Sequence, residues 1–181
     1  MRIDRLAMQE VAAAGRPATL RFFRWAQPSA SYGRLQKLDD IRPLIPHGWP
    51  VVQRPTGGGV VLHRNDLCMS LCWPDGQPPL PAGPSAQYEW IHRTIRDALA
   101  SLILLEWSSA HEAQDDFETR ECFSNPVQHD LVFSGQKIVG GALARRRGVT
   151  LYQGSIQSPG LDAAEAALSK AFERSFAGAH V

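Results

Sequence analysis

The stretch 51–63, VVQRPTGGGVVLH, places three consecutive glycines between two runs of β-forming residues. Glycine is a poor choice inside a strand, because it costs conformational entropy on folding and has no side chain to pack. It also lets backbone amides approach a ligand closely and form a concave anion-binding surface. Arg54 beside the glycines would add a planar set of donors for a phosphate or carboxylate. The stretch therefore predicts strand, loop and strand, with either a ligand-binding loop or a plain glycine-rich connection. It is neither a Walker loop nor a dinucleotide fingerprint, since it lacks the residues and spacing of both.

Segments of β and α character surround this loop without strict alternation. The segment 67–73 alternates in polarity, with Leu67, Met69 and Leu71 on one face, as in a strand. Because strands and helices do not follow one another in regular βα units, the expected fold class is α+β. The predicted strands are 19–25, 51–52, 60–62, 67–73, 149–152 and a hairpin of 131–133 with 137–139 that turns at Ser134-Gly135; the predicted helices are 3–14, one over apolar positions 88–102 with its N-cap at Ser85, and a last one opened by Ser158-Pro159.

Length and composition indicate one soluble domain. A chain of 181 residues fits the size of a single domain, and 44% apolar residues can bury a core. Nineteen basic against eighteen acidic side chains leave a net charge of +1, which excludes the strong field of a general nucleic-acid or membrane-surface binder. The sequence carries no apolar run that would span a bilayer and no signal-peptide pattern. Three cysteines favour a reducing compartment over a disulfide framework, so we expect a cytoplasmic protein.

A cysteine and a lysine are the candidate reactive side chains. Cys122 follows a polar stretch, 111–120, and Lys137 lies in the predicted hairpin between a turn and apolar residues. A lysine in such a position either reaches the surface or is retained for its charge. A thiol becomes a better nucleophile when a nearby cation favours its thiolate form, so Lys137 would activate Cys122 if the fold brings them together. The alternative is that Cys122 is an inert packing residue.

The other two cysteines indicate packing rather than chemistry. Cys68 and Cys72 lie on the same face of one predicted strand, about 13 Å apart at roughly 3.3 Å per residue, which is too far for a disulfide. They have no Cys/His partner pair at zinc-site spacing. We therefore interpret both as buried strand residues and predict no metal site.

Several blocks of the chain, taken in order, resemble the lipoate–protein ligase and octanoyltransferase superfamily. The segment 54–63 (RPTGGGVVLH) is similar to that family's acyl-binding loop, and 135–142 (GQKIVGGA) is similar to its lysine motif. The segment 149–156 (VTLYQGSI) resembles the strand after that motif, and 22–25 with 31–36 (SYGRLQ) resembles the family's early segments. The resemblance runs from about residue 6 to residue 160 and so covers most of the chain.

This resemblance implies a fold and an activity. The implied fold is the mixed, mainly antiparallel sheet flanked by helices of biotin–protein ligases and class II aminoacyl-tRNA synthetases, with 1–181 as one catalytic domain and no C-terminal accessory domain. The implied activity is transfer of an octanoyl or lipoyl group through a Cys122 thioester. The donor would be an acyl carrier protein, and the acceptor a lysine of the lipoyl domains of 2-oxoacid dehydrogenases or of the glycine cleavage H protein. Such a transferase would need no cofactor.

The resemblance also assigns the site residues. Cys122 would be the nucleophile and Lys137 the cation beside it, with backbone amides of the glycine loop as oxyanion donors. His63 and His129 are candidate proton carriers, and an ordinary hydrogen-bonded role is the alternative for each. The predicted substrate-binding residues are Arg54, Thr56, Gly57, Gly58, Gly59, Val60, His63, Gly140, Gly141 and Ala142.

Two other functions are left open by the sequence. In the catalytic subunit of an ATP-dependent lipoate–protein ligase, Lys137 and Arg54 would hold an acyl-adenylate, ATP and Mg²⁺ would be required, and Cys122 would be a bystander. A non-catalytic relative would keep the pocket and lose turnover. Leu143 and Gln153 favour this last alternative, because the family usually carries glutamine and histidine there.

Overall fold

The computed structural model describes residues 1–14, 17–109, 122–124, 126–157 and 160–178. The polar stretch 111–120 lies outside these ranges, and so do Ser158 and Pro159, the two residues predicted to open the last helix. The strands are β1 (Thr19–Phe23), β2 (Ser29–Tyr32), β3 (Val51–Gln53), β4 (Val61–His63), β5 (Leu67–Pro74), β6 (Glu106–Trp107), β7 (Leu131–Phe133), β8 (Gln136–Arg146) and β9 (Val149–Ile156). The helices are α1 (Arg2–Ala14), α2 (Leu38–Ile41), α3 (Pro84–Leu99), α4 (Leu161–Ala177) and a short 3-10 turn, Arg42–Leu44.

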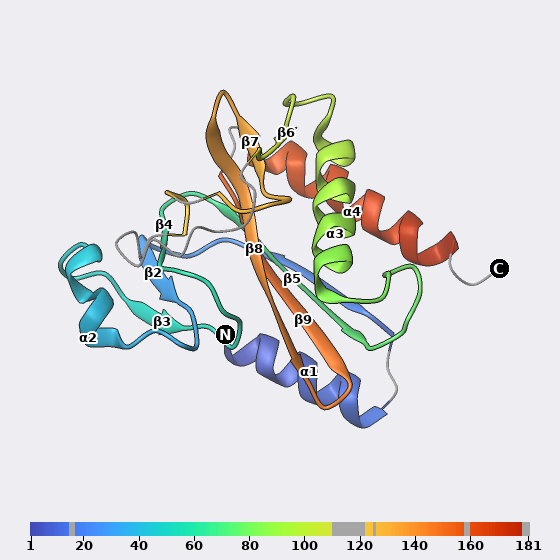
Figure 1. Ribbon diagram of the computed structural model, residues 1–181, viewed down its shortest axis with the longest axis horizontal. Coiled ribbons are helices and arrows are strands. Elements are labelled where there is room, and N and C mark those ends of the chain that lie inside the picture. Colours follow the sequence, from blue (N-terminus) through green and yellow to red (C-terminus); the bar gives the residue numbers. More distant parts are fainter. Residues whose placement is uncertain (15–16, 110–121, 125, 158–159, 179–181) are drawn as a thin grey trace.

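Two sheets form the frame of the molecule (Figure 1). The larger has the order β1-β5-β9-β8-β7-β6, and every neighbouring pair in it is antiparallel. In the smaller one, β2 pairs parallel with β3 and antiparallel with β4. The prediction of an α+β fold with a mixed, mainly antiparallel sheet flanked by helices is confirmed. Within the described residues, no helix has both the length and the apolar content that a membrane crossing requires.

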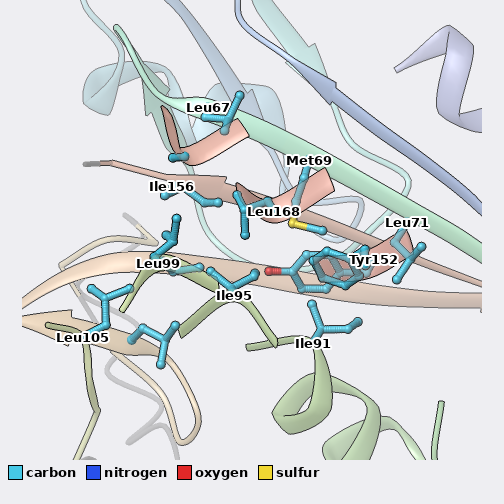
Figure 2. Close-up of a cluster of buried hydrophobic side chains, with 14 of the residues drawn as sticks. Leu67, Met69, Leu71, Ile91, Ile95, Leu99, Leu105, Tyr152, Ile156 and Leu168 are labelled. Atoms are coloured by element: carbon cyan, nitrogen blue, oxygen red, sulfur yellow. The ribbon is translucent and has the colours of Figure 1, made fainter. Parts of the chain in front are cut away.

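Helices cover both faces of the larger sheet. The main core lies between this sheet and α3 with α4, where Leu67, Met69 and Leu71 of β5 pack against apolar residues of both helices (Figure 2). On the opposite face, Cys72 packs with Val11 of α1. The predicted alternation of β5 is therefore confirmed, and the strand is buried from both sides because each face has its own helical layer.

The central hairpin is longer than the sequence predicts. β8 continues through the glycine pair to Arg146, and β9 continues to Ile156, whereas the predicted strands end at Val139 and Tyr152. The prediction was wrong because glycine normally weakens a strand interior. Here the two glycines provide space for neighbouring side chains, as described below.

Helix α3 also differs from its prediction at both ends. Gly83, with a positive φ of 87°, precedes the helix, and Pro84 occupies its first turn, so Ser85 is not the N-cap. The preset φ of proline suits that position. The helix ends at Leu99, and Leu102, predicted on its apolar face, lies beyond it and is half exposed.

Candidate active site

The glycine loop is held by Arg54. One guanidinium nitrogen of Arg54, Nη2, donates to the carbonyls of Gly57 (3.1 Å) and Gly59 (2.7 Å), and Nη1 donates to Ser31 Oγ (2.8 Å). The loop also packs tightly on Gly33, where an added Cβ would lie 2.1 Å from the carbonyl oxygen of Gly58. Burial lowers the pKa of Arg54, and the nearby Cys122 and Cys68 act in the opposite direction. Arg54 thus shapes the loop from inside.

Cys122 lies against the end of this loop, beside Lys137. Its backbone N–H donates to the carbonyl of Val60 (2.8 Å), which anchors the segment 122–124. Lys137 Nζ donates to the carbonyl oxygen of Cys122 (3.0 Å) and lies 3.7 Å from its Sγ. Cys122 is only partly buried, so its thiol can be reached. The structure therefore brings together the two residues that the sequence singled out.

The strand geometry around Lys137 explains the first glycine of the pair. The β7–β8 register shifts between Leu131 and Val132, which leaves one extra residue on β8. Residues three apart in a regular strand point to opposite faces, and an extra residue re-aims the side chains. The Lys137 side chain consequently lies over Gly140, where an added Cβ would meet its Cε at 2.2 Å. Gly140 is therefore required for the observed position of the lysine.

Asp130 is a site residue that the sequence analysis missed. It is fully buried, and its Oδ2 lies 2.7 Å from Lys137 Nζ and accepts the Val127 N–H at 2.7 Å. Its Oδ1 accepts a hydrogen bond from the Tyr88 hydroxyl (2.6 Å), which in turn accepts the Gly141 N–H (3.0 Å). Burial raises the pKa of Tyr88 well above its usual value, and Asp130 adds to this. We call Lys137, Asp130, Tyr88, His92 and Tyr152 the lysine cluster.

The other two members of the lysine cluster form a buried pair. Tyr152 OH lies 2.8 Å from His92 Nε2. Burial lowers the pKa of His92 to about 3, and the charge of Lys137 acts in the same direction. The ring is therefore neutral, and its Nε2 accepts a hydrogen bond from the Tyr152 hydroxyl. The Tyr152 ring occupies the space beside Gly141 and Gly154, where an added Cβ would lie 2.4 Å from it. This packing explains the second glycine of the pair.

A second cluster is centred on His63, and we call His63, Asp66 and Ser31 the histidine cluster. His63 Nδ1 lies 2.7 Å from Asp66 Oδ2, and His63 Nε2 lies 2.6 Å from Ser31 Oγ. Asp66 Oδ2 also accepts hydrogen bonds from Ser155 Oγ (2.5 Å) and Cys68 Sγ (3.2 Å). Burial alone would raise the pKa of Asp66, but the hydrogen bonds with His63, Ser155 and Cys68 and the electrostatic interaction with His63 outweigh it and lower that pKa overall.

The donor atoms of His63, Asp66 and Cys68 lie within 4.8 Å of one another, a grouping that spacing in the sequence did not reveal. Burial raises the pKa of Cys68 well above its usual value, and Asp66 adds to this. The thiol therefore keeps its proton and donates it to Asp66. Metal ligation requires the thiolate, so these contacts fit a hydrogen-bonded cluster better than a metal centre.

One pocket lies between the two clusters, and its empty space of about 430 Å³ includes the open solvent at its mouth. Lys137 does not line this pocket, but it contacts Cys122, which does. Thr56 lies outside the lining and supports the loop, donating from Oγ1 to Gln153 Oε1 (2.9 Å). His129 also lies outside the lining, with its ring edge-on to Trp107. The predicted site residues that line the pocket are Cys122, Arg54, Gly58, His63, Gly140, Gly141 and Ala142, and those that do not are Lys137, Thr56, Gly57, Gly59 and Val60.

The two residues that depart from the family pattern, Gln153 and Leu143, both make contacts that support the fold. Gln153 accepts from Thr56 and donates from Nε2 to Asp4 Oδ2 (2.7 Å), so it connects the glycine loop to α1. Leu143 packs against the main hydrophobic core. Neither side chain disturbs the contact between Cys122 and Lys137.

A glycine loop and the strand that carries Lys137 both border one cavity. This arrangement is that of a class of catalytic domain. The family model of the lipoyl protein ligase A/B catalytic domain matches residues 1–174, and the chain belongs to this family. The superfamily predicted from the motifs is thereby confirmed.

Individual relatives agree with this assignment. The octanoyltransferase LipM of Oceanobacillus iheyensis is 35% identical over 143 residues, which are 77% of this chain and 52% of that protein. The LipM of Kyrpidia tusciae is 32% identical over 168 residues, 86% of this chain and 60% of that protein. The chain thus spans between half and two thirds of the length of these curated relatives. Among solved structures, protein Ta0514 of T. acidophilum with bound lipoic acid shares the fold, with a TM-score of 0.68 at 19% identity over 98% of this chain and 82% of that one.

Proposed function

We propose that this protein is an acyltransferase that moves an octanoyl or lipoyl group through a thioester on Cys122 to a lysine of a lipoyl domain. The observation that carries the proposal is the position of Lys137 Nζ, 3.7 Å from the Sγ of Cys122, a residue that lines the pocket. The octanoyltransferase relatives support the choice of acyl group.

In the first half-reaction the Cys122 thiolate attacks the carbonyl carbon of the donor thioester. A new C–S bond forms, the donor's C–S bond breaks, and the donor leaves as a thiol after taking up a proton. A thiol suits this exchange because it is both a good nucleophile and a good leaving group. The positive charge of Lys137, held in place by Asp130, favours the thiolate. An acyl carrier protein is the donor we propose, and because its thioester is already activated, the reaction needs no cofactor.

In the second half-reaction an acceptor lysine takes the acyl group from Cys122. The amine nitrogen attacks the thioester carbonyl, an amide bond forms, and the Cys122 thiolate is released. The acceptors we propose are the lipoyl domains of 2-oxoacid dehydrogenases and the glycine cleavage H protein. The backbone of Gly58 and Gly140 lines the pocket, so their amides are candidates for stabilising the oxyanion.

The pairing of the two cations favours a transferase over an ATP-dependent ligase. A ligase would use Arg54 and Lys137 to hold an acyl-adenylate. Arg54 already donates to Ser31 and to two loop carbonyls, and Lys137 already pairs with Asp130. A phosphate would have to share these cations with their present partners, whereas thiolate chemistry uses the contacts as they are.

Intact-mass spectrometry of enzyme and acceptor tests the proposal. Purified wild-type protein, Cys122→Ala and the control Cys72→Ala are incubated with a lipoyl domain and either octanoyl-acyl carrier protein or lipoate with ATP and Mg²⁺. We expect an octanoyl adduct on wild type and Cys72→Ala, and about 10⁴-fold or more loss of transfer in Cys122→Ala, the scale seen when a covalent nucleophile is removed.

The other outcomes identify the alternatives. Acceptor modification that requires ATP and is unchanged in Cys122→Ala would establish the ligase. No reaction with either donor would favour a non-catalytic relative. Cys72 is a suitable control because it is buried on the α1 side of β5, away from the pocket.

A further inference from the structure

The histidine cluster has no role in the chemistry described so far, although it lines the same pocket as Cys122. Ser31, His63 and Asp66 are all buried, and Ser31 and His63 line the cavity. They come from three different places in the fold: β2, the end of β4 and the turn before β5. The Trp25 ring stacks on the His63 ring, with 4.7 Å between centroids, and fixes its plane. Both ring nitrogens and one face of His63 therefore have a partner, which is more than a buried histidine needs to satisfy its hydrogen bonds.

Arg54 sets the direction of one of these hydrogen bonds, and the tautomer of His63 sets the direction of the other two. A guanidinium can only donate, so Ser31 Oγ accepts from Arg54 Nη1 at 2.8 Å. The hydroxyl proton of Ser31 is then free to point at His63 Nε2, 2.6 Å away. In the tautomer that accepts the Ser31 proton, His63 Nδ1 carries the ring proton and donates it to Asp66 at 2.7 Å. Serine, histidine and aspartate are therefore connected in the order of a proton relay, with the basic Nε2 towards Ser31.

The second half-reaction needs such a relay. In water the acceptor lysine is an ammonium ion, because the ordinary pKa of a lysine is about 10.4, and an ammonium has no lone pair to attack with. Lys137 cannot take this proton, since it is itself a cation paired with Asp130. His92 is fully buried, and its ring nitrogen Nε2 already accepts from Tyr152. Among the described residues that line the pocket, His63 is the one histidine.

We infer that Ser31, His63 and Asp66 form a relay that removes the proton from the acceptor lysine before it attacks acyl-Cys122, an inference that rests on the proposed transferase function. The ammonium gives a proton to Ser31 Oγ while the Ser31 proton passes to His63 Nε2, and Asp66 holds the imidazolium. The neutral amine forms the C–N bond, and the C–S bond of the thioester breaks. The second amine proton goes to the departing Cys122 thiolate, and His63 returns its proton to solvent.

Single-turnover kinetics separate this relay from the acylation step. Wild type, His63→Gln, Ser31→Ala and the control Cys72→Ala are first acylated on Cys122 with an octanoyl thioester, and the acyl-enzyme is then mixed with a lipoyl domain. We expect transfer near pH 7 to fall by about 10²–10⁴-fold in His63→Gln and Ser31→Ala, the usual share of general-base catalysis, and to fall much further than acylation of Cys122 does.

A pH profile distinguishes a relay from a purely structural role. The transfer deficit of His63→Gln should shrink as the pH rises towards 9, because the fraction of acceptor amine that is already neutral in solvent rises about 100-fold from pH 7. The titratable and charged groups that face His63 are Asp66, Cys68, Arg54 through Ser31, and Cys122 in the same pocket. All four are retained in the His63→Gln protein.

Two results would overturn the relay, and they differ from a failure of the proposed function. Normal acylation with unchanged transfer in both His63→Gln and Ser31→Ala would exclude it. Equal slowing of both half-reactions, or a deficit independent of pH, would assign these residues to pocket structure. If wild-type protein forms no acyl-Cys122 at all, the transferase function fails and the relay with it. Should His63→Gln not fold, Ser31→Ala alone decides the question.

Discussion

Two buried histidines, one in each cluster beside the pocket, have opposite surroundings. His92 lies in the lysine cluster, where burial and the charge of Lys137 lower its pKa to about 3. His63 lies in the histidine cluster against the carboxylate of Asp66, whose own pKa is lowered overall in spite of burial. One histidine is kept neutral mainly by burial, with a nearby cation acting in the same direction, and the other has an anion beside it that would stabilise its protonated form.

This difference separates two requirements of acyl transfer. The lysine cluster supplies a fixed positive charge next to the thiol, because the Lys137–Asp130 pair is almost completely buried. In the relay that we infer, the histidine cluster supplies the proton acceptor for the second half-reaction. A single cluster would serve both needs poorly, since a fixed cation next to a histidine prevents it from acting as a base.

The largest expected effect on stability comes from breaking the lysine cluster. Lys137→Met leaves Asp130 as an unpaired buried charge, which should cost about 3–5 kcal/mol of unfolding free energy. The double variant Lys137→Met/Asp130→Asn removes that charge and should recover part of the loss, while both variants lose acylation of Cys122. Urea unfolding of the three proteins measures this. A cost below about 1 kcal/mol for Lys137→Met would contradict the fixed-charge account.

A smaller effect should come from displacing Lys137 without removing it. In Gly140→Ala the new methyl group would meet Lys137 Cε, so the ammonium must move away from Asp130 or from Cys122. We expect a loss of about 1–3 kcal/mol, as for other overpacked sites, together with slower acylation of Cys122. Gly178→Ala is the matched control, because an added Cβ there meets nothing within 4 Å. Unfolding curves and acylation rates that match the control would show that Gly140 is not needed for the lysine.

The pH dependence of stability tests the neutral histidine. The pKa of His92 is lowered to about 3 in the folded protein, whereas an ordinary histidine in the unfolded chain has a pKa near 6.5. Between these two pH values the unfolded chain therefore binds a proton on His92 that the folded chain does not bind. Stability should therefore fall as the pH falls through this window, and His92 should account for about 2 kcal/mol of the loss by pH 5. Urea unfolding at pH 7 and pH 5 measures the difference.

The variant His92→Gln should lose this part of the pH dependence, since its amide oxygen can still accept from Tyr152 without titrating. The exposed His47 provides the control, and His47→Gln should keep the wild-type difference between pH 7 and pH 5. An unchanged pH dependence in His92→Gln would mean that this histidine is protonated in the folded state, and the contrast between the two histidines would be lost.

The sequence predicted the reactive pair but not its support. Cys122 and Lys137 could be found because their residue types are rare in this chain and fall in recognisable motifs. Asp130 could not, because its contact with Lys137 depends on a register shift between β7 and β8 that residue spacing does not reveal. The predicted ligand contact of Gly140 stays a prediction, and the structure adds that this glycine makes room for the lysine side chain.

The fold was predictable to a similar extent. Alternation identified β5, and turn signals identified the β7–β8 hairpin. Strand ends were missed where glycines lie inside β8 and β9, since their reason is the tertiary packing of Lys137 and Tyr152. The order of Ser31, His63 and Asp66 was also beyond the sequence, because Ser31 and His63 approach through the antiparallel pairing of β2 with β4, which residue spacing does not reveal. The extent of the domain, 1–181, stays a prediction.

The central claim is that Cys122 carries the acyl group, and peptide mapping of the acylated protein tests it most directly. The chain has three cysteines, and burial raises the pKa of Cys72 to about 12 and that of Cys68 well above its usual value, so both should stay protonated and unreactive. After brief reaction with an octanoyl thioester and acid quenching, we predict a hydroxylamine-sensitive octanoyl group on the Cys122 peptide alone. Octanoyl on Cys68 or Cys72, or an acceptor domain modified while Cys122 stays free throughout, would contradict the account.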